Sequence, residues 1–227
     1  ENGREISRWL NNTLVNPDPE KKHVVDLNLS LLEPLGIRQT SFAFNMPISQ
    51  KAAERISEWL NEISPASPPC LISPGAGWET KRWFVEWYGQ LGTALAKETG
   101  RPVVVLWGPG EEDLRDAVLS AAHSESVIPA PPTDVLEMTE LIRRSALLIT
   151  NDTGPLHVAV GLGVPTVSIF GPSDPERNGP YGPGHKVLCA DVPCLGCWKT
   201  VCSGEDAMCC MKGVSVEDVL SAALDML

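Results

Sequence analysis

Short apolar runs alternate with longer amphipathic segments through the C-terminal two thirds of this sequence, and this alternation limits the possible folds more than any other feature. The apolar runs occupy residues 70–73, 103–107, 127–128, 146–150 and 166–170. The segments with helical spacing occupy residues 82–98, 111–122, 133–145 and 155–162. Fully apolar strands separated by helices are typical of parallel strands that are covered on both faces. We therefore predict an α/β fold with a doubly wound parallel sheet.

The region before this alternation has a different character. Apolar positions recur at helical spacing over residues 51–63, and Ile6, Trp9, Leu10 and Leu14 suit one face of an earlier helix. A proline-rich stretch at residues 64–69 then has the composition of a linker. We expect one unit over residues 1–64 and a second over residues 65–227, which includes a cysteine-rich segment at 189–210 and a terminal helix.

The charge balance narrows the class of partner. The chain has 29 acidic and 18 basic residues, which gives a net charge of −11. Such a chain is repelled by nucleic acid and by anionic lipid, so no nucleic-acid partner is expected. The longest uncharged apolar stretch, residues 158–170, is too short to cross a bilayer. Since the N-terminal residues are also too polar for a signal peptide, a soluble protein without a transmembrane segment is expected.

Several common site motifs are missing from the sequence. It contains no G-x-x-x-x-G-K-[ST] phosphate loop and no G-x-G-x-x-G after a strand. It also contains neither H-E-x-x-H nor G-x-S-x-G. Dehydrogenase-type cofactor binding, zinc proteolysis and serine hydrolysis therefore have no support.

The segment after the predicted strand at 146–150 is the strongest candidate for a binding site. Ligands of doubly wound folds sit beyond the carboxyl ends of the strands, and Asp152, Thr153 and Gly154 lie in such a loop. A helix opens at Pro155, and the free N–H groups of its first turn favour an anion. Gly154 allows close approach of a phosphate, Thr153 offers a hydroxyl, and His157 faces outward. The alternative interpretation is that Asp152 and Thr153 only cap the helix and that His157 is a surface residue.

Two further loops offer groups for a phosphorylated ligand. A glycine-rich turn beginning at Gly75 precedes the adjacent cations Lys81 and Arg82, of which one is expected to reach a diphosphate. A solvated pair of cations is the alternative. Glu111 or Glu112 has the chemistry to bind a ribose hydroxyl pair, although acidic residues in a first helical turn also simply stabilise the helix.

The order of these segments resembles glycosyltransferase family 9, the heptosyltransferases of lipopolysaccharide core assembly and their relatives. The resemblance rests on four runs in sequence order, LITNDTGPLHVA at 148–159, GVPT at 163–166, FGPSDP at 170–175 and GPYGP at 179–183. Weaker matches at residues 25–29, 73–76, 81–83 and 108–111 extend it over nearly the whole chain.

The resemblance implies a GT-B fold with two Rossmann-like domains, of which the C-terminal one holds a nucleotide-sugar donor. It implies metal-independent transfer, with inversion and without a cofactor, of a heptose-like sugar from an ADP-heptose-like donor to a lipid-linked saccharide. It places the protein in the cytoplasm, at the inner face of a bacterial inner membrane with peripheral contact. The donor-binding residues it implies are Ser73, Gly75, Thr80, Lys81, Glu111, Asp152, Thr153, Gly154 and His157. Lys81 would stabilise the charge that builds up on the leaving diphosphate.

Judged by this resemblance, residues 1–64 are too few for a complete N-terminal domain. About sixty residues precede the linker, whereas a Rossmann-like half needs on the order of 150. Residues 1–64 are therefore interpreted as a remnant of the acceptor-side domain, and no residue here matches the family's general base. We expect the chain to bind a nucleotide sugar and to transfer it poorly or not at all. The alternative is a noncatalytic nucleotide-sugar-binding module.

Six of the seven cysteines lie between residues 189 and 210. Their spacing allows a tetrahedral metal site from Cys194, Cys197, Cys202 and either Cys209 or Cys210. Disulfides and free structural thiols are the alternatives. A third hypothesis for the whole chain is therefore an interaction protein built around these thiols or a metal.

Overall fold

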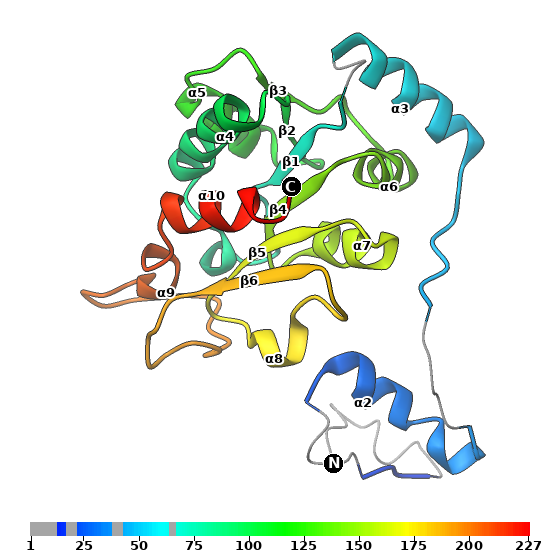
Figure 1. The fold of residues 1–227 in the computed structure, drawn as a ribbon. Helices are drawn as coiled ribbons and strands as arrows, with labels where there is room; N and C mark the ends of the chain where they lie inside the picture. The colour runs from blue at the N-terminus through cyan, green and yellow to red at the C-terminus, as the bar shows by residue number, and fades with distance from the viewer. Residues whose placement is uncertain (1–12, 17–21, 38–42, 64–66) are drawn as a thin grey trace.

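A parallel six-stranded sheet forms the centre of the molecule (Figure 1). The computed structural model describes residues 13–16, 22–37, 43–63 and 67–227. The strands are β1 (Cys70–Ser73), β2 (Val103–Val105), β3 (Val127–Pro129), β4 (Leu147–Asn151), β5 (Thr166–Phe170) and β6 (His185–Cys189). Their spatial order is β3-β2-β1-β4-β5-β6, and every neighbouring pair is parallel. This is the strand order of Rossmann folds, and it confirms the predicted doubly wound α/β class.

Helices cover both faces of the sheet (Figure 1). One face carries α4 (Val85–Thr99), α5 (Glu112–Ala121) and α10 (Val216–Leu224). The other carries α3 (Gln50–Ile63), α6 (Val135–Arg143) and α7 (Gly154–Leu162). The strand side chains alternate between the two layers, since Val103 and Val105 pack with the first set and Val104 with the second. All three valines are fully buried, which explains the uninterrupted apolar run.

Two elements of the fold differ from the prediction, namely strand β6 and the start of helix α4. Strand β6 was not predicted, because HKVLC mixes polar and apolar residues and lies at the edge of the sheet, where its side chains are only partly buried. Helix α4 begins at Val85 rather than at Arg82. Residues Glu79–Lys81 instead form the short 3-10 helix η2, and Arg82 after them has an extended backbone.

The segment before α3 contacts the loops that follow β5. Helix α2 (Val24–Ser30) precedes the 3-10 helix η1 (Glu33–Leu35), and most of the helix expected over the first residues lies outside the described part. Lys22 pairs with Glu176 at 2.6 Å. The His23 ring bonds to the Gly179 carbonyl through Nε2 at 3.0 Å. The N-terminal part is therefore joined to the region around α8 (Pro175–Asn178), and Figure 1 shows α2 facing α8.

Helix α3 lies before the expected linker but packs on the main sheet unit. It lies against α6, and Ile56 is fully buried in the same apolar cluster as Leu71 and Leu148. This packing continues the layer that covers the sheet, and the boundary at residues 64/65 stays a prediction. None of the helices in the described part of the chain has the length and apolar character needed to cross a bilayer.

Candidate active site

A buried ion pair lies where the strand order reverses. Lys81 ends η2 in the segment between β1 and α4, and Asp152 directly follows the neighbouring strand β4. The distance from Lys81 Nζ to Asp152 Oδ2 is 2.6 Å. The two side chains are only 14% and 6% exposed, respectively. The topology thus places one cation and one anion in the crevice where Rossmann folds bind their ligands.

The environment of Asp152 keeps its carboxyl group ionised. Burial by itself raises the pKa of Asp152, but favourable interactions with His157, Lys81 and Ser173 outweigh it and lower the pKa to about 2. His157 Nε2 lies 3.8 Å from Oδ1, and half of the His157 side chain is exposed. Asp152 therefore holds Lys81 on one oxygen and faces His157 with the other.

Helix α7 begins beside this pair without a side-chain cap. Its N-cap residue Thr153 has an extended backbone, and the Thr153 side chain makes no capping hydrogen bond. No atom lies within 4 Å of the position that a Cβ on Gly154 would occupy. No side chain thus caps the first-turn N–H groups, and the helix dipole favours an anion beside them. This geometry favours the anion-site interpretation over the alternative in which Asp152 and Thr153 cap the helix.

Glu111 reaches from the end of β2 toward the loop after β1. Its Oε2 accepts a hydrogen bond of 2.9 Å from the Gly108 N–H. A Cβ built on Gly75 would lie 2.1 Å from Glu111 Oε1, so a side chain at this position would make the Glu111 carboxylate move. The structure therefore brings Gly75 and Glu111 together, whereas Glu112 forms the first residue of α5.

Three other residues near these loops have partners within the chain. The Arg82 Nε–H donates to the Ala76 carbonyl at 3.2 Å, so of the two adjacent cations Lys81 is the one that contacts Asp152. The Thr80 hydroxyl donates to the Lys199 carbonyl at 2.8 Å, which ties η2 to the cysteine-rich segment. Ser73 is buried at the end of β1, and its carbonyl accepts a bond of 3.3 Å from the Thr150 hydroxyl.

Asn151 is a structural centre of the site that sequence reasoning missed. This fully buried residue accepts a bond of 3.1 Å from the Trp83 N–H through Oδ1. Its amide donates to the Pro74 carbonyl at 3.1 Å. Asn151 thus fixes the end of β4 to the β1 loop and to the residues before α4. The available signal was a polar residue that closes an apolar strand directly before Asp152.

Trp78 was also missed. Its indole ring lies 4.4 Å from Lys81 Nζ, as a cation–π contact that supplements the ion pair. The signal was an aromatic residue three positions before the candidate lysine.

The cysteine-rich segment does not assemble the predicted metal site. In the described ranges, no group of three or more His, Cys, Asp and Glu side chains is placed to hold a metal ion. The Cys194 and Cys209 sulfurs are 3.7 Å apart, which is a contact between two free thiols. The set of Cys194, Cys197, Cys202 and Cys210 stays a prediction that this geometry does not support.

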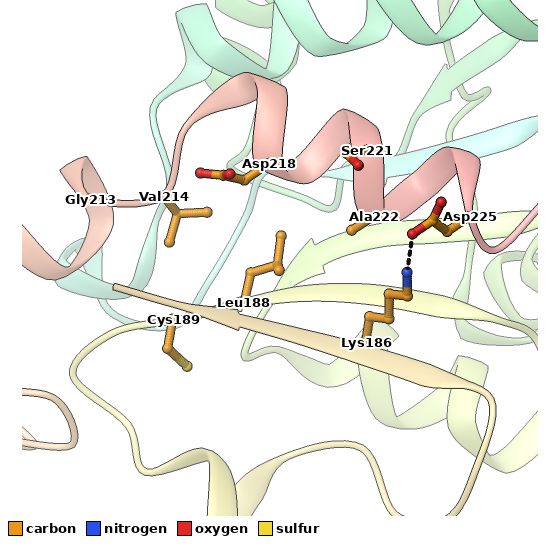
Figure 2. Close-up of a pocket in the computed structure, with 9 residues that line it drawn as sticks. All are labelled: Lys186, Leu188, Cys189, Gly213, Val214, Asp218, Ser221, Ala222 and Asp225. Atoms are coloured by element: carbon orange, nitrogen blue, oxygen red, sulfur yellow. Dashed lines mark hydrogen bonds and ion pairs between the residues drawn. The ribbon is translucent and has the colours of Figure 1, made fainter. Parts of the chain in front are cut away.

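Two cavities are lined by neither Lys81 nor Asp152. One of 430 Å³ lies between β6 and α10, where Leu188 and Val214 point into it and the Lys186–Asp225 ion pair of 2.8 Å bridges one end (Figure 2). It contains none of the predicted donor-binding residues. The other, of 410 Å³, is lined by residues of η2, the start of α4 and the cysteine-rich segment, and includes Thr80.

The ion pair at Asp152 predicts a specific loss of stability in acid. Since the pKa of Asp152 falls from its ordinary 3.8 to about 2 on folding, its contribution is fully present above pH 4 and is lost as the pH falls through 2. The contribution is about 2.5 kcal/mol, at about 1.4 kcal/mol for each pKa unit. Urea unfolding at a series of pH values is expected to show this loss in the parent chain and not in Asp152→Asn. The exposed Asp206→Asn variant is the control. If Asp152→Asn lost stability in acid as the parent chain does, the assignment would be wrong.

Fold and site together define a class, namely a GT-B-type Rossmann-like unit with a buried Lys81–Asp152 ion pair at the carboxyl edge of its sheet. Residues 2–208 match the family described as glycosyltransferase family 9 (heptosyltransferase). The chain belongs to this family.

Known proteins agree with this membership. Lipopolysaccharide heptosyltransferase 1 of Pseudomonas aeruginosa is 32% identical over 146 residues, which cover 64% of this chain and 41% of that protein. A glycosyltransferase family 9 structure from Veillonella parvula matches with a TM-score of 0.77 and 24% identity over 93% of this chain and 62% of its own. Escherichia coli heptosyltransferase WaaC, solved with ADP, has a TM-score of 0.70 and 18% identity over 99% of this chain and 63% of its own. The chain spans less than half the length of the first curated relatives, at 41%, 47% and 45%.

Proposed function

We propose that this chain binds the nucleotide-sugar donor of a heptosyltransferase, with ADP-heptose as the type of donor. The observation that supports this most is the Lys81–Asp152 pair beside the uncapped start of α7, at the point where the strand order reverses. Such a crevice suits a diphosphate, because one cation and several N–H donors converge on it. The solved WaaC structure carries ADP, which supports an adenine nucleotide as the leaving group.

In the proposed reaction, the bond between the donor's anomeric carbon and the diphosphate oxygen breaks. Negative charge then grows on the diphosphate, and Lys81 together with the N–H groups of α7 stabilises it. Asp152 holds the lysine in place from a site that is almost closed to water. Glu111 is positioned to accept the ribose hydroxyls, and Thr153 and His157 would line the sugar side. The incoming hydroxyl belongs to a lipid-linked saccharide of the lipopolysaccharide core type and attacks with inversion, and its proton passes to a general base for which no residue of this chain is matched.

The proposed place of action is the cytoplasmic face of a bacterial inner membrane. A lipid-linked acceptor requires the enzyme to work at a membrane surface, which peripheral contact provides. No resident metal or cofactor is part of the proposed reaction.

Calorimetric titration with ADP and with ADP-heptose tests this proposal. Saturable binding of both, with a clear preference over UDP, is expected. A sugar-transfer assay with a lipopolysaccharide core acceptor then separates a catalytic chain from the alternative, a noncatalytic nucleotide-sugar-binding module. The assay is run with and without a separately supplied N-terminal, acceptor-side half, because this chain alone is expected to transfer poorly. Binding without transfer in both runs supports the module, and the absence of binding contradicts both.

Gly75→Ala is expected to weaken ADP binding about tenfold. The new methyl group would occupy the position of the Glu111 carboxylate and push it away from the ribose, and one hydrogen-bonding group contributes about this much. Gly77→Ala is the matched control in the same loop, since no atom lies within 4 Å of the Cβ position there. Equal ADP affinity of the two variants would remove Glu111 from the proposed site.

A further inference from the structure

An aromatic and cationic cluster extends from the Lys81 site to helix α8. Lys81 lies over the Trp78 ring, and the Trp78 and Trp198 rings meet edge to face with centroids 6.3 Å apart and an interplanar angle of 78°. The Arg177 guanidinium lies 5.6 Å from the centre of the Trp198 ring. Trp78, Trp198 and Arg177 together are called the Trp198 platform below. The proposed chemistry at Lys81 and Asp152 makes no use of Trp198 or Arg177.

The backbone holds Trp198 at the surface in an unfavourable conformation. Trp198 has a φ of 58°, and among the described non-glycine residues only Met208 also has a positive φ. The Trp198 N–H donates to the Pro172 carbonyl at 2.7 Å, and the next residue, Lys199, accepts the bond from Thr80. The Trp198 side chain is nonetheless 39% exposed. A bulky residue in the left-handed region costs free energy, and such strain concentrates at functional sites.

The platform carries one cation, the Arg177 guanidinium, in a chain with a net charge of −11. The nearby Lys81 is paired with Asp152, so it adds no net charge there. In the described ranges, Arg177 Nη1 donates to the side-chain oxygen of Asn178 at 2.8 Å rather than to a carboxylate. The neighbouring carboxylates are engaged elsewhere. Glu176 pairs with Lys22, and Asp174 accepts the Glu176 N–H as the N-cap of α8.

The platform also lies on the side of the donor site that faces the N-terminal segment. Arg177 is carried by α8, which the Lys22–Glu176 pair joins to the residues just before α2. Figure 1 shows the same arrangement, with α8 between the sheet and α2. A group bound on the platform would therefore lie next to the donor diphosphate, toward the acceptor-side part of the chain.

We propose that Trp198 and Arg177 form an acceptor subsite for an acidic saccharide. The exposed indole would stack on a face of the sugar ring, and the guanidinium would pair with a carboxylate or phosphate on that sugar. Trp78 contacts both Trp198 and Lys81. The side chains that would bind the acceptor and the donor are therefore in contact through Trp78. This inference rests on the proposed function, because it names the substrate class of the same site.

The test compares matched sugars on the chain saturated with ADP. Methyl glucuronoside, glucose 6-phosphate and the neutral methyl glucoside are titrated and followed by saturation-transfer NMR. Both acidic sugars are expected to bind more tightly than the neutral one, by about tenfold for one charge-assisted contact. Arg177→Gln is expected to abolish this preference. Trp198→Leu is expected to weaken all three sugars, whereas Trp198→Phe retains most of the binding.

Arg115→Gln provides the matched control. Arg115 also stacks on a tryptophan, with its guanidinium 4.4 Å from the Trp107 ring, but it already pairs with Asp116. This variant is expected to keep the preference for acidic sugars. No saturable binding of the acidic sugars, or an unchanged preference in Arg177→Gln, overturns the subsite while ADP binding persists. Loss of ADP binding in the parent chain instead contradicts the proposed function itself.

Discussion

Lys81→Ala is expected to weaken ADP binding by about 10- to 100-fold, the usual range for a hydrogen-bonded charge. In a transferring enzyme the catalytic rate is expected to fall by about 10²- to 10³-fold, because the lysine acts most strongly on charge that develops as the bond breaks. Two effects combine in this variant. The diphosphate loses its cation, and the buried Asp152 carboxylate, freed from its partner at 2.6 Å, would repel the ligand.

Calorimetry with ADP measures the loss of affinity. Further variants separate the effect of the lost cation from that of the repulsion by the unpaired Asp152 carboxylate. Lys81→Met combined with Asp152→Asn removes both charges and is expected to bind ADP better than Lys81→Ala alone, since the repulsion is gone. Lys97→Ala, in the last turn of α4, is the control and is expected to bind ADP as the parent chain does. ADP affinity that is unchanged in Lys81→Ala would show that the diphosphate lies elsewhere.

Asn151→Ala is expected to destabilise the fold by about 3 kcal/mol, as the sum of buried polar groups left without partners. The Trp83 N–H and the Pro74 carbonyl would both lose their bonds in a region closed to water. Asn151→Asp is expected to destabilise as well, because a carboxylate would then face the carbonyls of Pro74 and Gly75.

Urea unfolding near neutral pH measures this loss. Asn61→Ala, on the exposed side of α3, is the matched control and is expected to change stability by less than about 0.5 kcal/mol. A similar small change in Asn151→Ala would mean that water replaces the lost bonds and that Asn151 does not hold the loops together. ADP affinity measured on the folded fraction would then also be unaffected.

The central strands and their loops could be predicted because burial on both faces leaves a direct trace in the sequence. The strands β1, β4 and β5 consist mostly of buried apolar residues, and the ends of β1 and β5 were predicted to the residue. The meeting of Lys81 and Asp152 followed from the same logic, since the carboxyl ends of neighbouring parallel strands lie at one edge of the sheet.

The remaining features depend on contacts that no local pattern encodes. The edge position of β6 relaxes the requirement for apolar residues, so HKVLC resembles a loop. The partner of Thr80 lies 119 residues further along the chain, and nothing near η2 indicates it. Asn151 was visible as a polar residue, but its two partners come from segments that are brought together only by the fold.

The internal pairing of Lys81 has a consequence for which anions the crevice admits. Because its charge and that of Asp152 cancel at contact distance, a chloride or a single phosphate meets little net attraction there. A pyrophosphate is long enough to touch the lysine and the start of α7 at once, and gains from both. Discrimination between one phosphate and two would thus precede any recognition of base or sugar.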